Sequence, residues 1–251
     1  MLATISVFGL ISGNEPENGN LKTTAGSLRL NVQNLTNYSS VRFHQTPFFL
    51  PWVFPKIWWK RPVTGKVVFL TFDDGPIPEV TEFVLEQLEL FKAKATFFCV
   101  GENLDKYPHI AQKVVAQGHT LGNHTYHHVK AWQNTMAAYQ QEVLACQVAI
   151  DKISPTVGSQ KLFRPPHGQL TFKNLRMLEK DFQVVLWSAL SYDFDATLPP
   201  EICLQKTLAA IKPGAIVVLH DSLKAEKNLR YVLPRLLAHC QKLGYSLQAV
   251  A

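Results

Sequence analysis

Short apolar runs alternate with amphipathic stretches from residue 66 to the end of the chain. Seven runs rich in β-branched or aromatic residues predict strands, namely "KVVFLTF", "ATFFCVG", "HTLGN", "KLFRP", "QVVLWS", "AIVVLHD" and "SLQAV". Between them the apolar positions recur with a helical period, which predicts helices over residues 79–92, 107–117, 135–152, 171–180, 200–210 and 226–243. This alternation predicts an α/β fold with a parallel sheet. Seven strands suit a barrel better than an open, doubly wound sheet, but the pattern alone is compatible with both.

The chain before residue 66 differs in composition. Residues 1–43 are rich in Asn, Ser, Thr and Gly without a lasting period, which predicts a loosely ordered N-terminal extension and a single domain over residues 44–251. Residues 47–59, "PFFLPWVFPKIWW", are packed with aromatic rings and broken by prolines. Two interpretations stay open for this segment: contact with a membrane surface, or rings that cover the floor of the barrel. We favour the second.

The composition excludes several classes of protein. The net charge of +6 is mild and the basic residues are scattered, so we predict no nucleic-acid partner. No apolar run reaches the roughly 18 residues that a membrane span needs. The start, "MLATISVFGLISG", has no basic residue before Lys22, so we expect a cytoplasmic protein, with export or membrane-surface association as alternatives. No obligate protein partner is evident. The four cysteines lack CxxC spacing and are expected to be buried thiols: Cys99, Cys146, Cys203 and Cys240.

Polar residues with acid, base or ligand chemistry stand where the predicted strands end. The C-terminal ends of parallel strands meet on one face of the fold, where active sites lie. Five separate stretches therefore bring their polar residues into one basin: Asp73 and Asp74, His124 and His128, Arg164, Asp193, and His220.

Each stretch also has a plainer interpretation. Asp73 or Asp74 alone suits a turn, Arg164 suits an extended surface segment, and we interpret Asp221 as a cap of the helix that follows. A helical turn over 124–128 would place both imidazoles on one face, although one such pair is unremarkable by itself. Together, one carboxylate and two histidines supply three ligands and leave a fourth position open, as in catalytic metal sites.

Five motifs carry a resemblance to a known family. "TFDDGP", "HTYHH", "FRPPHG", "WSALSYDF" and "VVLHD" occur in the order of the motifs of the NodB-homology polysaccharide deacetylases, carbohydrate esterase family 4. The resemblance covers residues 66 to about 250. It implies a distorted (β/α) barrel of about seven parallel strands, NodB-like and related to the TIM barrel. It also implies a metal-dependent hydrolase that removes acetyl groups from an acetylated carbohydrate.

The resemblance implies a role for each motif residue. Asp73 would be the general base that activates water, held ionised by Arg164, and His220 would be the general acid, held by Asp193. The remaining roles fall into two sets. One divalent metal ion, zinc first and cobalt, nickel or manganese as alternatives, would be bound by Asp74, His124 and His128. The substrate would be contacted by Leu219, which would line the pocket for the acetyl methyl group, and by His167, Phe194 and Trp187.

Three positions depart from the family pattern and leave the substrate open. The family often has an acidic residue at Leu190, a tryptophan at Phe194 and a tyrosine at His167. Three hypotheses follow. The first is a metal-dependent deacetylase that removes the acetyl group from the nitrogen of an amino sugar. The second is a hydrolase of non-peptide C–N bonds in cyclic imides or ureides. The third is an inactive relative that binds glycans.

Overall fold

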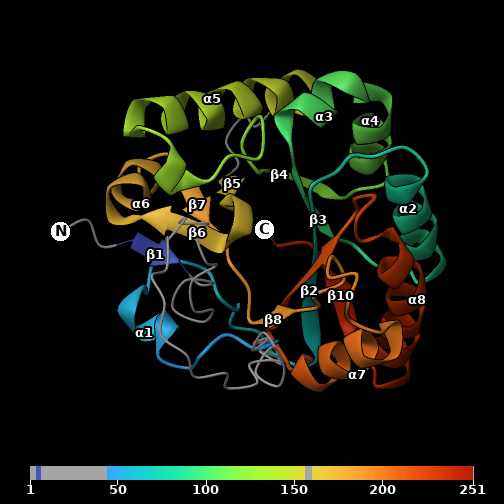
Figure 1. The fold of residues 1–251 in the computed structure, drawn as a ribbon. Coiled ribbons are helices and arrows are strands. Elements are labelled where there is room, and N and C mark those ends of the chain that lie inside the picture. The colour runs from blue at the N-terminus through green and yellow to red at the C-terminus, as the bar shows by residue number, and fades with distance from the viewer. Residues whose placement is uncertain (1–3, 7–43, 156–159, 251) are drawn as a thin grey trace, which may run out of the picture.

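The computed structural model describes residues 4–6, 44–155 and 160–250, and parallel strands run through its centre (Figure 1). Seven parallel strands form the main path of the sheet. Their order is β7 (Phe182–Val184), β5 (Lys161–Phe163), β4 (Thr120–Asn123), β3 (Thr96–Cys99), β2 (Val67–Asp73), β9 (Ile216–His220) and β8 (Ala189–Leu190). An eighth strand, β10 (Ser246–Gln248), pairs in parallel with the start of β2. The path curls into a half-barrel, which confirms the predicted α/β class with about seven parallel strands.

The predicted strand "QVVLWS" forms two short strands instead of one. Phe182–Val184 pairs with β5 at one end of the path, whereas Ala189–Leu190 pairs with β9 near the other end. Residues 185–188 cross between them, because the backbone N–H of Val185 donates to β5 and that of Ser188 donates to Ile216. One stretch of chain thereby spans the opening of the half-barrel, which no local pattern could show.

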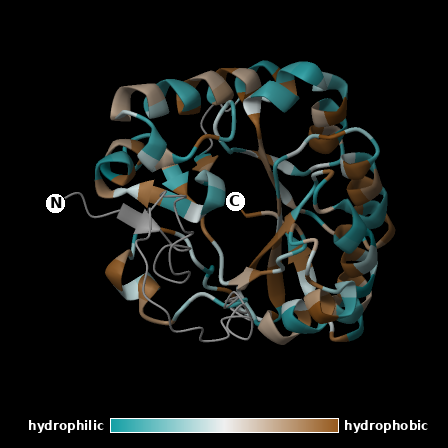
Figure 2. Cartoon of the chain, in the orientation of Figure 1, coloured by the Kyte–Doolittle hydropathy of each residue, from teal (hydrophilic) through white to brown (hydrophobic). Residues whose placement is uncertain are grey.

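Helices cover the outside of the sheet and turn apolar faces toward it (Figures 1 and 2). In α8, the residues Leu229, Val232, Leu233, Leu236 and Leu237 are fully buried, and their spacing is the helical period that predicted this element. All six predicted helices form within a few residues of their expected bounds. They are α2 (Val80–Leu90), α4 (Pro108–Ala116), α5 (Met136–Ile153), α6 (Phe172–Leu178), α7 (Pro200–Ala210) and α8 (Glu226–Lys242). The short α3 (Gly101–Lys106) was not predicted, because six residues carry too little periodicity.

The aromatic segment lies partly in the core and partly in solvent. It contains the short helix α1 (Leu50–Val53). Leu50, Ile57 and Trp59 are buried in the core, which confirms the favoured interpretation for these residues. Phe48 and Trp52 are 90% and 89% exposed, so contact with a membrane surface is the interpretation that applies to these two rings.

Isolated backbone bridges fasten this segment and the residues on either side of it to distant parts of the sheet. Gln45 bridges Ala189, Trp58 bridges Val185 and Lys60 bridges Ala215. The backbone N–H of Trp58 also donates to Val184 O in β7, and Gln45, just before the segment, pairs with β8. The segment and the residue before it thereby contact both strands that end the path of the sheet.

The predicted extension over residues 1–43 lies mostly outside the described residues. Its described part, β1 (Thr4–Ser6), pairs antiparallel with β6 (Gln169–Thr171). All four cysteines are free and buried, as predicted. Among the described residues, no helix combines the length and the apolar character that crossing a membrane requires.

Candidate active site

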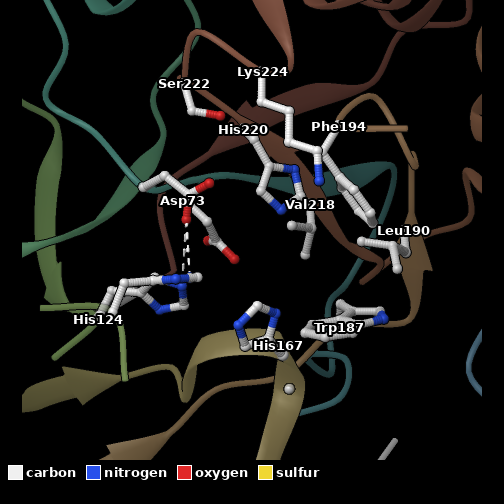
Figure 3. A pocket seen from close by; sticks show the side chains of 13 residues that line it. Asp73, His124, His167, Trp187, Leu190, Phe194, Val218, His220, Ser222 and Lys224 are labelled. Carbon is white, nitrogen blue, oxygen red and sulfur yellow. Dashed lines mark ion pairs between the residues drawn. The ribbon is translucent and has the colours of Figure 1, made fainter. Parts of the chain in front are cut away.

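A cavity of about 350 Å³ opens at the C-terminal ends of the strands, at the lower end of the size range of ligand sites (Figure 3). Every predicted catalytic and metal-binding residue except Arg164 and Asp193 lines it, and those two lie directly behind lining residues. The lining consists of Asp73, Asp74, His124, His128, His167, Gly168, Trp187, Leu190, Phe194, Val218, His220, Ser222 and Lys224.

The two adjacent aspartates both line the cavity because the backbone changes course between them. Asp73 is the last residue of β2, and successive side chains of a strand point to opposite faces. Asp74 has φ of 82°, a left-handed conformation that aspartate tolerates better than most residues. Its backbone is held on both sides, because its N–H donates to Phe98 O and its carbonyl accepts from Asn103 Nδ2 at 2.8 Å.

Asp221 fixes the loop that follows the aspartates rather than capping a helix, so that prediction was wrong. Its carboxylate accepts from the backbone N–H of Gly75 at 3.1 Å and from Thr81 Oγ1 at 2.6 Å. A β-carbon on Gly75 would lie 2.0 Å from Asp221 Oδ2, so the loop requires glycine there. Burial raises the pKa of Asp221 to about 8.

Asp74, His124 and His128 bring one ligand atom each to within 4.8 Å of one another. Asp74 Oδ1 lies 3.7 Å from His124 Nε2 and 3.3 Å from His128 Nε2. His124 Nδ1 donates to the carbonyl of Arg164 at 2.7 Å, which leaves the lone pair of Nε2 facing the cavity. Burial, followed by the charge of His128, lowers the pKa of His124 well below its usual value, so its ring is neutral. This donor set fits a divalent metal ion.

The two histidines do not lie on a helical turn, contrary to the sequence-based expectation. Residues 124–128 form a loop in which Thr125 and His128 have φ of 64° and 55°. Asn123 Oδ1 accepts from the backbone N–H of Thr125, and Thr125 Oγ1 accepts from that of Val129. These side-chain bonds replace helical ones, and the rings still meet, with centroids 5.1 Å apart.

Arg164 forms an ion pair with Asp73 behind the wall of the cavity. Its Nη1 donates to Asp73 Oδ1 at 2.6 Å, and the guanidinium is fully buried. Three further N–H groups donate to Thr71 Oγ1, Val185 O and Leu186 O, so four of the five N–H groups of the buried cation have partners. Burial raises the pKa of Asp73, and the positive charges of Arg164 and His220 offset only part of that effect.

Asp193 holds His220 on the other side of the cavity. Its Oδ1 accepts from His220 Nδ1 at 2.7 Å, and its Oδ2 accepts from the backbone N–H of His220 at 2.8 Å. Burial of the ring favours its neutral form, but Asp193 and then Asp74 and Asp73 outweigh it and raise the pKa of His220 to about 9. The imidazolium is therefore the form of His220 at neutral pH.

Three of the four predicted substrate contacts line the cavity: His167, Trp187 and Phe194. His167 is left-handed, with φ of 57°, and its ring centroid lies 4.8 Å from that of His128. Burial, helped by the positive charges of His128 and nearby lysines, lowers the pKa of His167 to about 4. His167 is therefore neutral at physiological pH.

The structure does not place Leu219 in the cavity, so that prediction was wrong. Leu219 is fully buried and absent from the lining, which Val218 joins instead. Side chains alternate along β9, so the face that carries His220 into the cavity also carries Val218. This residue could have been found by counting back two positions from the histidine. Ser222 and Lys224 were also missed, because they lie in a loop without any periodic signal.

Taken together, the site belongs to an α/β hydrolytic enzyme that gathers Asp73, Asp74 and three histidines, His124, His128 and His220, at the C-terminal ends of parallel strands. The family with the description "Polysaccharide deacetylase" matches residues 60–184. This chain belongs to the polysaccharide deacetylase family and is an enzyme of that type.

Curated relatives match most of the chain. A peptidoglycan-N-acetylglucosamine deacetylase from Bacillus cereus is 32% identical over 197 residues, which cover 77% of this chain and 90% of the relative. A chitooligosaccharide deacetylase from Azorhizobium caulinodans is 30% identical over 197 residues, covering 72% and 91%.

Solved structures share the fold. A peptidoglycan N-acetylglucosamine deacetylase in complex with 4-naphthalen-1-yl-N-oxidanyl-benzamide has a TM-score of 0.74 and 26% identity, covering 82% of this chain and 95% of that one. A family pseudoenzyme from Bacillus anthracis has a TM-score of 0.67 at 21% identity, covering 77% of this chain and 67% of that one. The fold alone therefore does not establish activity.

Proposed function

We propose that this protein is a metal-dependent hydrolase that removes the acetyl group from the nitrogen of an acetylated amino sugar. The observation that carries the proposal is the grouping of three ligand side chains beside two separate ion pairs, Arg164–Asp73 and Asp193–His220. The names of the curated relatives, which are deacetylases of peptidoglycan and chitooligosaccharides, support the choice of substrate.

The ligand set has a defined part in this chemistry. Asp74, His124 and His128 would hold one divalent cation, for which zinc is our first choice because two imidazoles and a carboxylate are its usual ligands. A divalent cation at this position supplies positive charge that polarises the acyl oxygen and makes a nearby water more acidic.

Asp73 and His220 move the protons of the reaction. Asp73, whose pKa burial raises, accepts a proton from the attacking water, and Arg164 keeps its carboxylate oriented. The oxygen of that water then bonds to the acyl carbon. An amine is a poor leaving group, so the C–N bond breaks as His220 donates the Nε2 proton to the departing nitrogen. Asp193 stabilises the imidazolium that makes this donation possible.

Acetate release tests the proposal directly. Protein reconstituted with zinc, cobalt, nickel or manganese is incubated with N-acetylglucosamine oligomers, peptidoglycan fragments, acetylated xylan and a cyclic imide. We expect acetate and a free amine from the amino-sugar substrates. Turnover of the cyclic imide alone would instead support the second hypothesis, a different C–N hydrolase. Absence of turnover on every substrate with every metal would support an inactive glycan-binding relative.

His220→Asn checks the assignment of the acid on the same substrates. Because His220 is not a metal ligand, we expect metal content to remain and the rate of amide cleavage to fall by about 10²–10⁴. The rate of cleavage of an aryl acetate, whose leaving group needs no proton, should fall much less in the same variant. Equal losses on the amide and the ester would contradict the role of His220 as the acid.

A further inference from the structure

Lys224 places a positive charge over the cavity from the loop that follows β9. Its side chain lines the cavity, and Figure 3 shows it extending between His220 and Phe194. Its Nζ lies 5.5 Å from the centroid of the Phe194 ring. The ammonium group of a lysine usually extends into bulk water or pairs with a carboxylate. Within the described part of the chain, the ammonium of Lys224 contacts the Phe194 ring and forms no ion pair.

The loop that carries Lys224 is anchored close to the reacting groups. The backbone N–H of Asp221 donates to Asp73 O at 3.1 Å, and that of Ala225 donates to Ser222 O at 3.0 Å. The side chain of Lys224 therefore extends from a backbone tied to the end of β2. Its position over the cavity follows from this anchoring and from its contact with Phe194.

A second polar group of this loop also has no partner. The hydroxyl of Ser222 lines the cavity, is buried, and forms no hydrogen bond with any other described residue. Leaving a buried hydroxyl unsatisfied costs free energy, so a site that supplies it with a partner is favoured. The loop thus presents two groups able to donate to a ligand.

The charges in the cavity are divided between its two sides. The carboxylates belong to Asp73 and Asp74, beside the ligand histidines. Beside Lys224 the wall is formed by His220 and by the apolar residues Leu190, Phe194 and Val218, and it contains no acidic residue. Lys224 is itself exposed, so an anion can reach its ammonium from the cavity, and no carboxylate on this wall competes for that charge.

We propose that Lys224 selects acetylated sugars that carry an anionic group, a carboxylate or a phosphate, close to the acetamide that is cleaved. The inference rests on the proposed function, since it places the acetamide beside Asp73 and His220 and the ring against Phe194. Lys224 acts in binding and not on the reacting atoms.

Competition among three probes tests the inference. The probes are a neutral N-acetylglucosamine oligomer, N-acetylglucosamine 1-phosphate, and a disaccharide that carries the lactyl carboxylate of N-acetylmuramic acid. We expect wild-type protein to have a higher kcat/KM for one or both anionic probes than for the neutral one. In Lys224→Met this ratio should fall by about ten- to a hundredfold, the range for a hydrogen bond to a charged group. The change should appear in KM, because an interaction made equally in the ground and transition states does not alter kcat.

Lys227→Met is the matched control, because Lys227 is exposed on the first turn of α8 and does not line the cavity. It should keep the wild-type ratio. Added salt should reduce the ratio of kcat/KM for the anionic probes to that for the neutral probe in wild type, and should leave this ratio unchanged in Lys224→Met. A decrease of the ratio with the phosphate alone, or with the carboxylate alone, identifies which anion the site takes.

Binding measurements keep the inference testable without turnover. The affinities of the metal-loaded protein for glucosamine 1-phosphate and for glucosamine are compared by calorimetry in wild type and Lys224→Met. Tighter binding of the phosphate that is lost in Lys224→Met supports the inference even if no acetate is released. Equal affinities in wild type, or equal kcat/KM values for neutral and anionic probes, would overturn it while leaving the proposed deacetylase intact.

Discussion

Asp73 and Asp74 are neighbours in the chain but have different partners. Asp73 pairs with a buried arginine, and Asp74 faces two imidazoles. Repulsion between the two carboxylates is offset on both sides, by the guanidinium of Arg164 and by the cation that the ligand set would hold. Replacement of each aspartate by its neutral amide separates the two roles.

Asp74→Asn should lower both metal content and activity, because an anionic ligand is lost. Raising the metal concentration should restore part of the activity. Asp73→Asn keeps the ligand set, so we expect near wild-type metal content with little activity at any metal concentration. Dialysis against zinc followed by metal analysis makes the comparison. Loss of metal from Asp73→Asn together with its retention in Asp74→Asn would show that the roles are reversed.

Asp193→Asn should move the alkaline limb of the activity profile to lower pH. Asp193 and the other carboxylates raise the pKa of His220 above its usual value, so in wild type the acid is protonated at neutral pH and activity falls as pH rises through that pKa. Removing the charge of Asp193 removes the largest effect that raises this pKa, so the fall should begin closer to neutrality. The dependence of kcat/KM on pH measures the shift. An alkaline limb at the same pH in both proteins would mean that His220 is not the group that titrates.

The site residues could be predicted where chemistry and chain position coincide. Asp73, His124 and Arg164 stand at strand ends, and the convergence of parallel strands placed them together correctly. Leu219 was placed wrongly because it was chosen as the immediate neighbour of His220, although adjacent side chains of a strand point to opposite faces. Lys224 could not be found, because a single lysine in a loop differs in no visible way from a solvated one.

Among the elements, the aromatic segment is the least predictable from local pattern. Prolines interrupt it, so neither the helical nor the strand period of apolar residues is visible. Its backbone contacts are with residues far along the chain. Burial of Leu50, Ile57 and Trp59 shows that it is part of the domain. Each fully buried side chain of this size contributes about 1.5–3 kcal/mol. Their sum is comparable with the roughly 5–15 kcal/mol that stabilises a typical protein.

Truncation tests the boundary of the domain. A protein that starts at residue 44 should fold and bind metal, because it keeps the bonds between His44 and Leu190 and the bridge of Gln45 to Ala189. One that starts at residue 62 loses the aromatic segment and should be insoluble or melt far below the longer protein. Thermal melts and metal content distinguish the two. Equal melting temperatures would mean that the segment contributes nothing to stability.

At the scale of the whole molecule, the cavity and the exposed aromatic side chains lie at different ends of β9. His220, at the end of this strand, faces the cavity, whereas Ala215, just before its start, lines a depression shared with Phe48. Lys60 and Lys212 line the same depression. Aromatic rings beside lysines are typical of proteins that bind anionic lipid surfaces, and such binding would leave the cavity directed away from the lipid.

Vesicle sedimentation tests this expectation of membrane contact. With vesicles that contain anionic lipid, we expect wild-type protein to sediment and the double variant Phe48→Ser, Trp52→Ser to remain largely in solution. Leu90→Ser, at a position 71% exposed on α2, is the control for the loss of an exposed apolar side chain and should behave as wild type. Wild-type protein that stays in solution would leave the exposed rings without a lipid-binding role.

The bridge of Lys60, just after the aromatic segment, also limits when this part of the domain can close during synthesis. Lys60 leaves the ribosome early but must wait for Ala215, its partner. At about 5–20 residues per second, that partner is made roughly 8 to 30 seconds later. Until then the chain around the segment lacks part of its native contacts, and the segment is only partly covered. The nascent chain therefore spends this interval in a form that favours binding by chaperones and aggregation with its neighbours.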